Sequence, residues 1–288
     1  MSTVLTGKEV AQAIKEDCRL RVELLQKDHI YPKLAVLRLG QRADDINYEN
    51  SILKNAQNLG IASQSVTLPE SCLQQELEDV LDRLSADPHI HGILLFCPLP
   101  KQIDTKAALQ HLNPAKDIDG LTYGNYAHIY AGDREGFAPC TPSAVMALLD
   151  FYHIAVAGKN VLVIGRSLVV GKPLAMLLLG QNATVTVAHS KTEQLPALCQ
   201  KADIVCAAVG RANFVDDTFV SENQIVIDVG VNADPKRENA VCGDVDFAKV
   251  QDKVAAITPV PRGVGSVTTA ILLRNTVIAA ERMANREG

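Results

Sequence analysis

The segment at residues 161–173, V-L-V-I-G-R-S-L-V-V-G-K-P, constrains the fold more than any other part of the chain. Its first four residues form a short apolar run that is typical of a central parallel strand, and Gly165 permits a sharp turn after it. A helix is expected to begin at Gly171, with Pro173 in its first turn, where a backbone N–H has no partner within the helix. This order predicts an anion site, because free N–H groups and the positive end of the helix dipole would face a phosphate.

The glycine spacing is G-x5-G rather than G-x-G-x-x-G, so dinucleotide binding is predicted from the strand, turn and helix more than from a motif. A second predicted strand, residues 183–188, ends in H-S-K-T, where an NAD-specific fold usually has an acid for the ribose 2′-hydroxyl. Arg166 and Ser190 are instead suited to a 2′-phosphate, which favours NADP over NAD as the cofactor. The alternatives are an ordinary αβ turn, a solvated Arg166 and a Ser190 that caps a helix.

The composition excludes several classes of protein. The 288 residues, 47% hydrophobic and 21% charged, are enough for two moderate cores. The net charge is −5 and no basic run occurs, so no nucleic-acid partner is expected. The apolar stretches are too short for a membrane span and the N-terminus lacks the apolar core of a signal peptide, so we expect a cytoplasmic protein without a membrane partner. The seven dispersed cysteines form no C-x-x-C, so neither a disulfide framework nor a metal site is expected.

Predicted strands alternate with predicted helices along most of the chain. In the first half we expect strands over 33–39, 62–68 and 91–96 and helices over about 8–27, 45–59 and 73–85. Later we expect strands over 204–209 and 224–230, a loop over 255–266 and a C-terminal helix. This alternation predicts an α/β fold with two domains, an N-terminal parallel-sheet domain and a Rossmann domain. The C-terminal helix is expected to return to the first domain, which gives 1–139 with 267–288 and 140–266.

A set of motifs extends over almost the whole chain. They are Tyr48 with its helix, P-L-P at 98–100, K-D-I-D-G at 116–120, P-C-T-P at 139–142, G-R-S-x-x-V-G-x-P at 165–173, I-D-V-G at 227–230, G-D-V at 243–245, and T-P-V-P with G-V-G at 258–265. In order and spacing this set resembles the methylenetetrahydrofolate dehydrogenase/cyclohydrolase family. The resemblance implies an N-terminal catalytic domain that binds a tetrahydrofolate derivative, an NAD(P)-binding Rossmann domain and a homodimer. It also implies a multifunctional oxidoreductase and hydrolase of one-carbon metabolism and purine biosynthesis.

Such an enzyme oxidises 5,10-methylenetetrahydrofolate to 5,10-methenyltetrahydrofolate with NADP and hydrolyses the product to 10-formyltetrahydrofolate. The resemblance implies that Tyr48 borders the folate and that Asp119, the acid of D-x-D-G, contacts the pterin ring, so these two are the predicted catalytic residues. The other predicted substrate-binding residues are Pro98, Leu99, Gly265 and Ser266. The predicted cofactor-binding residues are Gly165, Arg166, Ser167, Val170, Gly171, Ser190, Val209, Gly210, Asp228 and Gly230. From the residues alone, Asp119 is equally suited to capping the turn at Gly120.

The departures from the family pattern lie on the substrate side. The family has Y-x-x-x-K, with the lysine as the chief catalytic residue, whereas Y-E-N-S-I places Ile52 at that position. Phe96 stands where the family has the glutamine of Q-L-P-L-P. Lys54 is expected to point elsewhere, because it lies roughly 240° around the helix from Tyr48 while Ile52 lies roughly 40° around. An unpaired buried amide costs about 1–3 kcal/mol, so the joint change to two apolar residues indicates a coherent repacking.

Three smaller departures accompany these two. Asp45 stands where the family commonly has serine, Ala144 where it has the glycine of P-C-T-P-x-G, and Arg262 adds a charged side chain to its glycine-rich segment near the expected folate and nicotinamide contact.

We therefore expect an NADP-dependent methylenetetrahydrofolate dehydrogenase whose cyclohydrolase step is lost or weak, because isoleucine cannot transfer a proton to or from water. One alternative is the full bifunctional enzyme, with another group doing the work of the lysine. The other is a non-catalytic folate-binding or dinucleotide-binding paralogue.

Overall fold

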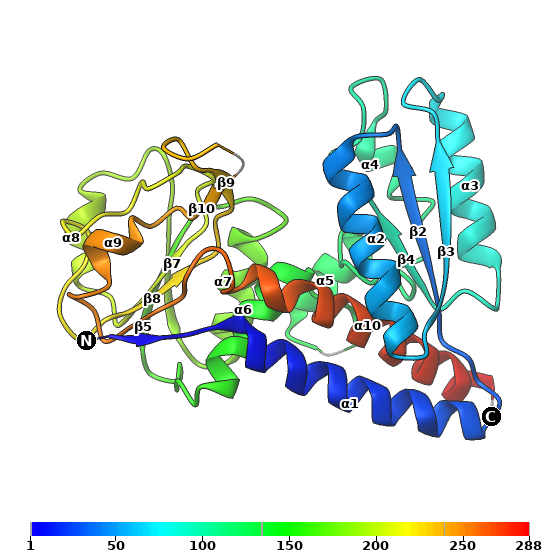
Figure 1. The fold of residues 1–288 in the computed structure, drawn as a ribbon, viewed down its shortest axis with the longest axis horizontal. Helices are drawn as coiled ribbons and strands as arrows, with labels where there is room; N and C mark the ends of the chain where they lie inside the picture. Colours follow the sequence, from blue (N-terminus) through cyan, green and yellow to red (C-terminus); the bar gives the residue numbers. More distant parts are fainter. Residues whose placement is uncertain (1, 134, 239, 288) are drawn as a thin grey trace. The chain divides into compact units, whose positions relative to one another are not determined.

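The computed structural model describes residues 2–133, 135–238 and 240–287, and the chain divides into two compact units, each built on a parallel sheet (Figure 1). We call them the three-stranded unit and the six-stranded unit. The three-stranded unit consists of Ala13–His128, Asp133–Ala138 and Leu272–Gly288. The six-stranded unit consists of Met1–Gln12, Ile129–Gly132 and Pro139–Ile271.

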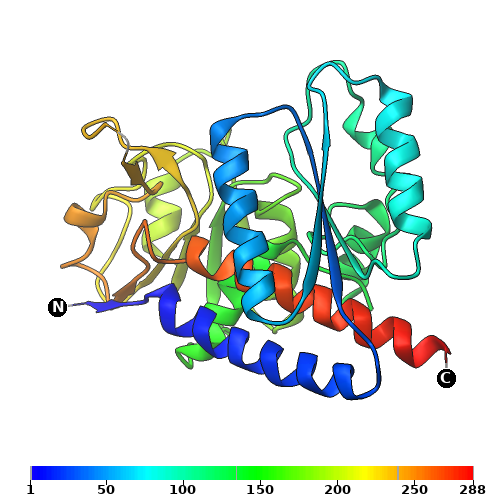
Figure 2. The ribbon, with the colours of Figure 1, turned by 45° about the vertical axis from the view of Figure 1, so that its right-hand side comes forward.

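The three-stranded unit has the strand order β3-β2-β4 with all pairings parallel. Its strands are β2 (Lys33–Leu39), β3 (Ala62–Leu68) and β4 (Gly92–Leu95). Its longer helices α2 (Ala43–Asn58) and α3 (Gln74–Ala86) flank the sheet in Figures 1 and 2, and two short helices are α4 (Thr105–Ala108) and α5 (Tyr123–Ala131). The predicted strands and helices of this half agree with the structure to within two residues, because long elements carry a clear periodicity.

The helices at the two ends of the chain run side by side in both views. They are α1 (Gly7–Lys27) and α10 (Gly265–Glu287), and Arg21 forms an ion pair with Glu281 between them. Asn275 of α10 also donates through Nδ2 to the carbonyl oxygen of Ile118 at 2.9 Å. The last part of α10, from Leu272, therefore packs within the three-stranded unit.

The six-stranded sheet has the order β1-β11-β8-β7-β5-β6, and all its pairings are parallel. Its strands are β1 (Thr3–Val4), β5 (Asn160–Ile164), β6 (Thr184–Ala188), β7 (Ile204–Ala207), β8 (Ile225–Asp228) and β11 (Ala256–Ile257). Its helices are α6 (Cys140–Phe151), α7 (Gly171–Gly180), α8 (Leu195–Gln200) and α9 (Phe247–Val250). A short antiparallel pair, β9 (Asn232–Ala233) and β10 (Val241–Cys242), stands apart from the sheet. The chain leaves β5 for β6 on one side and then crosses to β7 on the other, so the strand order reverses beside β5.

Two short strands differ from the sequence-based expectation. The expected loop over 255–266 contains β11, which pairs with β8 and β1. Residues 1–12, which the sequence assigned to the first domain, cluster with the six-stranded unit because β1 pairs with β11. Strands of two residues are too short to show a hydrophobic period, so no pattern marked them.

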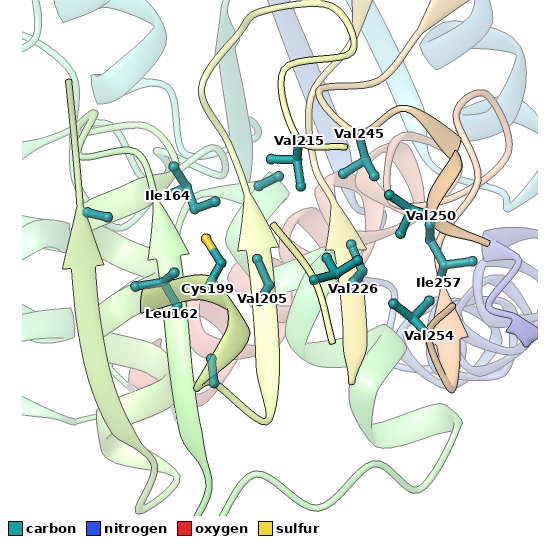
Figure 3. Packing of buried hydrophobic residues seen from close by; sticks show 14 residues of the cluster. Leu162, Ile164, Cys199, Val205, Val215, Val226, Val245, Val250, Val254 and Ile257 are labelled. Carbon is teal, nitrogen blue, oxygen red and sulfur yellow. The ribbon is translucent and has the colours of Figure 1, made fainter. Parts of the chain in front are cut away.

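Aliphatic side chains fill the core of the six-stranded unit, as the absence of tryptophan requires. Figure 3 shows Leu162, Val205, Val226 and Ile257 on one face of the sheet, one from each of four adjacent strands, with Cys199 of α8 packed among the same cluster. Each fully buried valine or leucine contributes about 1.5–3 kcal/mol relative to an exposed one. Along the described residues, no helix is long and apolar enough to cross a membrane.

Candidate functional site

The predicted strand, glycine turn and helix are present as β5, Gly165 and α7. Gly165 has a φ of +132°, a conformation that L side chains rarely adopt, and a Cβ there would collide with the carbonyl oxygen of Ala208. A Cβ on Gly171 would collide with the carbonyl oxygen of Gly165. Both glycines are therefore required, because the turn lies against the segment after β7 and α7 begins directly on the turn.

The sequence predicted free N–H groups at the start of α7, but in the structure these groups already have partners. The N–H groups of Val170 and Gly171 donate to the hydroxyl of Ser167, at 3.1 and 3.5 Å, and that of Lys172 donates to its carbonyl oxygen at 3.0 Å. The first turn of α7 is thus already satisfied by the chain. By contrast, the N–H groups of residues 166–169 donate to no residue that the structure describes, and these four residues are exposed. An anion would therefore meet the loop before α7 rather than the helix itself.

Arg166 and Ser190 occupy equivalent positions on neighbouring strands. Ile164 pairs with Ala188, so each of the two residues lies two positions beyond the end of the ladder. Both are exposed, and Arg166 forms no hydrogen bond or ion pair with any described residue. Ser190 is not a helix cap, because α8 begins only at Leu195. The two side chains remain available for a shared anionic group.

The predicted cofactor residues after β7 and β8 divide into exposed and buried ones. Val209 is half-buried and Gly210 is exposed with a φ of +67°, so this backbone is accessible. Asp228 is only 2% exposed, and its oxygens accept the N–H groups of Gly230, Asp244 and Val245. Burial, together with the neighbouring Asp244 carboxylate, raises the pKa of Asp228 to about 7. Asp228 and the buried Gly230 therefore stabilise the backbone at the carboxyl edge of the sheet. Contact of either residue with a ligand stays a prediction.

On the substrate side, Tyr48 is presented by a helix that is anchored to the sheet. Its neighbour Glu49 is 3% exposed and binds Arg38 of β2 and Ser65 of β3. Tyr48 lies about 100° around the helix from Glu49 and is 42% exposed. This buried ion pair between Arg38 and Glu49 was not predicted from the sequence, although Glu49 is the neighbour of Tyr48.

Tyr48 lies against the segment that carries P-L-P. Its ring centroid is 5.6 Å from that of Phe96, and the two planes are tilted by 39°. The N–H of Phe96 donates to the carbonyl oxygen of Leu37 at 2.9 Å, which fixes the exit of the chain from β4 beside β2. The next residues of this segment include the exposed Pro98 and the half-buried Leu99. The structure thus joins Tyr48 to the predicted substrate segment.

Ile52 and Lys54 lie on different sides of α2, as the helical geometry predicts. Ile52 is 0% exposed and belongs to the core. Lys54 is exposed and lines a shallow surface hollow with Gln57 and Ser63. Tyr48 is not among the residues of that hollow.

The segment that carries Asp119 is held rigidly. The N–H of Ile93 donates to the carbonyl oxygen of Lys116 at 2.7 Å, which ties the segment to β4. The turn is closed by Asp117, whose Oδ2 accepts the N–H of Thr122 at 2.7 Å and Nδ2 of Asn125 at 2.9 Å. Asp117 therefore caps this turn, a role that the sequence also allowed for Asp119. Asp119 itself is half-buried.

Electrostatic effects place Asp119 near the substrate segment. Desolvation of the thiol, together with the charges of Asp119 and Asp117, raises the pKa of Cys97 to about 11, although the residue as a whole is exposed. Burial and the same two carboxylates also raise the pKa of Tyr126 to about 12. Asp119, Cys97 and Tyr126 therefore share one neighbourhood, and Tyr126 is a candidate site residue that sequence reasoning missed.

Gly265 and Ser266 belong to the six-stranded unit, where they begin α10 and are exposed. Nearby, Arg262 has a φ of +78°, a left-handed conformation that is rare for a residue with a long side chain. Its carbonyl oxygen accepts the N–H of Gly7 at 2.7 Å. Arg262 thus stores local strain in an exposed segment, which is a common feature of functional loops.

Of the other two smaller departures, one is a core change and the other a surface change. Ala144 is 0% exposed within α6, and Asp45 lies 3.8 Å from Arg42 in an ion pair at the start of α2.

The parallel sheet with its reversal beside β5, the glycine turn and the exposed loops at its carboxyl edge define a Rossmann-type nucleotide-binding protein with a second α/β unit. Residues 139–284 match the tetrahydrofolate dehydrogenase/cyclohydrolase NAD(P)-binding domain, and residues 5–119 match the catalytic domain of the same family. The chain belongs to the tetrahydrofolate dehydrogenase/cyclohydrolase family.

Relatives match over nearly the full length. The chain is 49% identical over 281 residues to the bifunctional protein FolD 1 of Desulfitobacterium hafniense, covering 98% of this chain and 99% of the relative. The crystal structure of the bifunctional FolD of Campylobacter jejuni has a TM-score of 0.95 at 38% identity, covering 98% and 99%. The FolD of Trypanosoma brucei, solved with NADP cofactor and an inhibitor, has a TM-score of 0.92 at 36% identity, covering 98% of each chain.

Proposed function

We propose that this protein is a bifunctional enzyme that oxidises 5,10-methylenetetrahydrofolate with NADP and hydrolyses the resulting 5,10-methenyltetrahydrofolate to 10-formyltetrahydrofolate. The observation that carries this proposal is the 46–49% identity, over 98% of the chain, to proteins named bifunctional FolD. Matches to both family domains support it, because each reaction step depends on the folate site and the first also needs the dinucleotide site.

The turn after β5 and the end of β6 fit NADP. The exposed N–H groups of residues 166–169 suit the pyrophosphate, and Arg166 with Ser190 suits the 2′-phosphate. The glycines at 165 and 171 support this fit, because a Cβ at either position would collide with the backbone of the turn. Bound NADP would accept a hydride from the one-carbon bridge of the folate.

Tyr48 and Asp119 are proposed to orient the folate. The exposed ring of Tyr48, supported from one side by Phe96, offers an apolar surface with a hydroxyl at its edge. The carboxylate of Asp119 would accept hydrogen bonds from the N–H groups of the pterin ring. Their contribution is to hold the reacting carbon in place, since hydride transfer depends mainly on position.

A dehydrogenase with little or no cyclohydrolase activity is the second candidate, and position 52 favours it. The resemblance implies a lysine there, whereas Ile52 is completely buried and has no proton to exchange. Lys54 is exposed and lines a separate hollow with Gln57 and Ser63, and Tyr48 is not among the residues of that hollow, which supports this candidate. If this candidate is right, hydride transfer survives because it needs no proton donor at position 52.

Separate assays of the purified protein distinguish the two candidates. One assay follows NADP reduction with methylenetetrahydrofolate, and the other follows the loss of methenyltetrahydrofolate in the absence of dinucleotide. Both activities are expected from the bifunctional enzyme, and oxidation alone from the second candidate. A protein that neither oxidises nor hydrolyses these folates would contradict both.

The double variant Ile52→Lys with Phe96→Gln tests the role of position 52. If the wild-type protein lacks a proton-transfer group, we expect methenyl hydrolysis to rise about 100-fold, which is the usual size of a general acid–base contribution. Ser51→Lys is the matched control, because it adds an amine to an exposed neighbouring position of α2. An unchanged hydrolysis rate in the double variant would favour another group as the base.

A further inference from the structure

Asp244 is a fully buried carboxylate at the carboxyl edge of the six-stranded sheet. Its Oδ2 accepts the N–H groups of Val209 at 2.6 Å and Gly210 at 3.0 Å. Its Oδ1 accepts the N–H of Arg211 at 2.8 Å and Nδ2 of Asn232 at 2.9 Å. Within the described residues no basic side chain forms an ion pair with it, so four N–H dipoles stabilise its charge.

The loop that Asp244 holds has one fixed side and one open side. Residues 209–211 follow β7, the strand beyond the reversal of strand order. Gly210 is exposed, and a Cβ added there would meet no atom within 4 Å. In an open α/β sheet, the strands beyond the reversal carry the second mononucleotide half. The open side of this loop is therefore suited to the nicotinamide nucleotide.

A second aspartate reinforces the anchor. Asp228 accepts the N–H groups of Asp244 at 2.9 Å and Val245 at 3.0 Å. A Cβ on Gly243 would collide with the Asp228 carboxylate, and one on Gly230 would collide with that of Asp244. Gly243 of the motif G-D-V thus leaves room for Asp228, and Gly230 of the motif D-V-G leaves room for Asp244. The reciprocal arrangement joins the end of β8 and the loop after β7 into one block.

We propose that Asp244 is a positioning residue for the nicotinamide half of the dinucleotide, because it fixes the backbone of residues 209–211 against which that half would rest. The inference rests on the proposed function, since it takes NADP as the ligand. Asp244 acts through the loop and not on the substrate, because its own oxygens are buried and occupied. Asparagine at this position would turn an amide N–H2 towards N–H donors, so part of the loop would have to move.

Two ligands separate the two halves of the site. Calorimetry with NADP reports on the whole site, and calorimetry with adenosine 2′,5′-bisphosphate reports on the adenosine half alone. We expect Asp244→Asn to weaken NADP binding about tenfold and to leave bisphosphate binding unchanged. Asp203→Asn is the matched control, because Asp203 accepts the N–H of Asn160 at 2.8 Å at the opposite edge of the same sheet. This control is expected to bind both ligands as the wild-type protein does.

The binding measurements either support or overturn the role proposed for Asp244. Wild-type affinity for NADP in Asp244→Asn, or an equal loss of both ligands, would overturn it, because the first denies any role and the second indicates a general structural one. A wild-type protein that does not bind NADP would instead overturn the proposed function. If Asp244→Asn does not fold, Asn232→Ala decides, since it removes one donor and leaves the carboxylate. About threefold weaker NADP binding with unchanged bisphosphate binding then supports the inference, and unchanged NADP binding overturns it.

Discussion

Asp228 makes the stability of the six-stranded unit depend on pH. Its side chain is buried, and the titratable groups that face it are the carboxylate of Asp244 and the thiol of Cys242. Its pKa is about 7 in the folded protein, against 3.8 for an ordinary aspartate. Between these values the folded state holds a proton that the unfolded state has released, so the free energy of unfolding falls as the pH rises from about 4 to about 7.

Asp228→Asn imitates the protonated aspartate and should remove this part of the pH dependence. We subtract the free energy of unfolding of the wild-type protein from that of the variant. This difference is expected to rise by about 2 kcal/mol or more between pH 5 and pH 8. Urea unfolding of both proteins at several pH values measures this difference. A difference that stays constant with pH would show that Asp228 is already ionised at pH 5.

At the scale of elements, the glycine turn between β5 and α7 determines the shape of the nucleotide-binding edge. Gly165 has a φ of +132° and lies against the backbone at Ala208, and Gly171 lies against Gly165. The turn thereby brings the ends of β5 and β7 together and leaves the loop of residues 166–169 exposed.

Gly165→Ala should destabilise the six-stranded unit by about 3 kcal/mol or more, because the new Cβ meets both a forbidden φ and the Ala208 carbonyl. Gly180→Ala is the matched control at the other end of α7, where a Cβ would meet nothing within 4 Å. It is expected to stabilise the protein by about 0.5 kcal/mol through helix propensity. Thermal unfolding measures both changes, and equal effects of the two variants would contradict the account of the turn.

The sequence predicted the long elements and the glycine turn, because buried parallel strands and amphipathic helices carry clear patterns. It did not predict β1 and β11, which are two residues long and form only through pairing with other strands. Of the candidate site, the motifs predicted that Tyr48 and the P-L-P segment both serve the substrate, but they did not predict the ring contact between Tyr48 and Phe96. Nor did they predict the roles of Ser167 and Asp117, because each depends on which N–H groups the folded backbone turns towards its side chain.

At the scale of the whole molecule, the family domains extend over both units of the chain. The three-stranded unit carries the candidate folate residues Tyr48 and Asp119, and the six-stranded unit carries the candidate NADP residues. The homodimer that the resemblance implies stays a prediction.

Hydride transfer from methylenetetrahydrofolate to NADP, which we propose for this chain, can be followed with an isotope label. Purified protein is given NADP and 5,10-methylenetetrahydrofolate whose bridging carbon carries two deuterium atoms, and the mass of the reduced dinucleotide is determined. We expect one deuterium in each NADPH formed. NADPH without deuterium, or no NADPH at all while the folate is stable and the protein folded, would contradict the proposed hydride transfer.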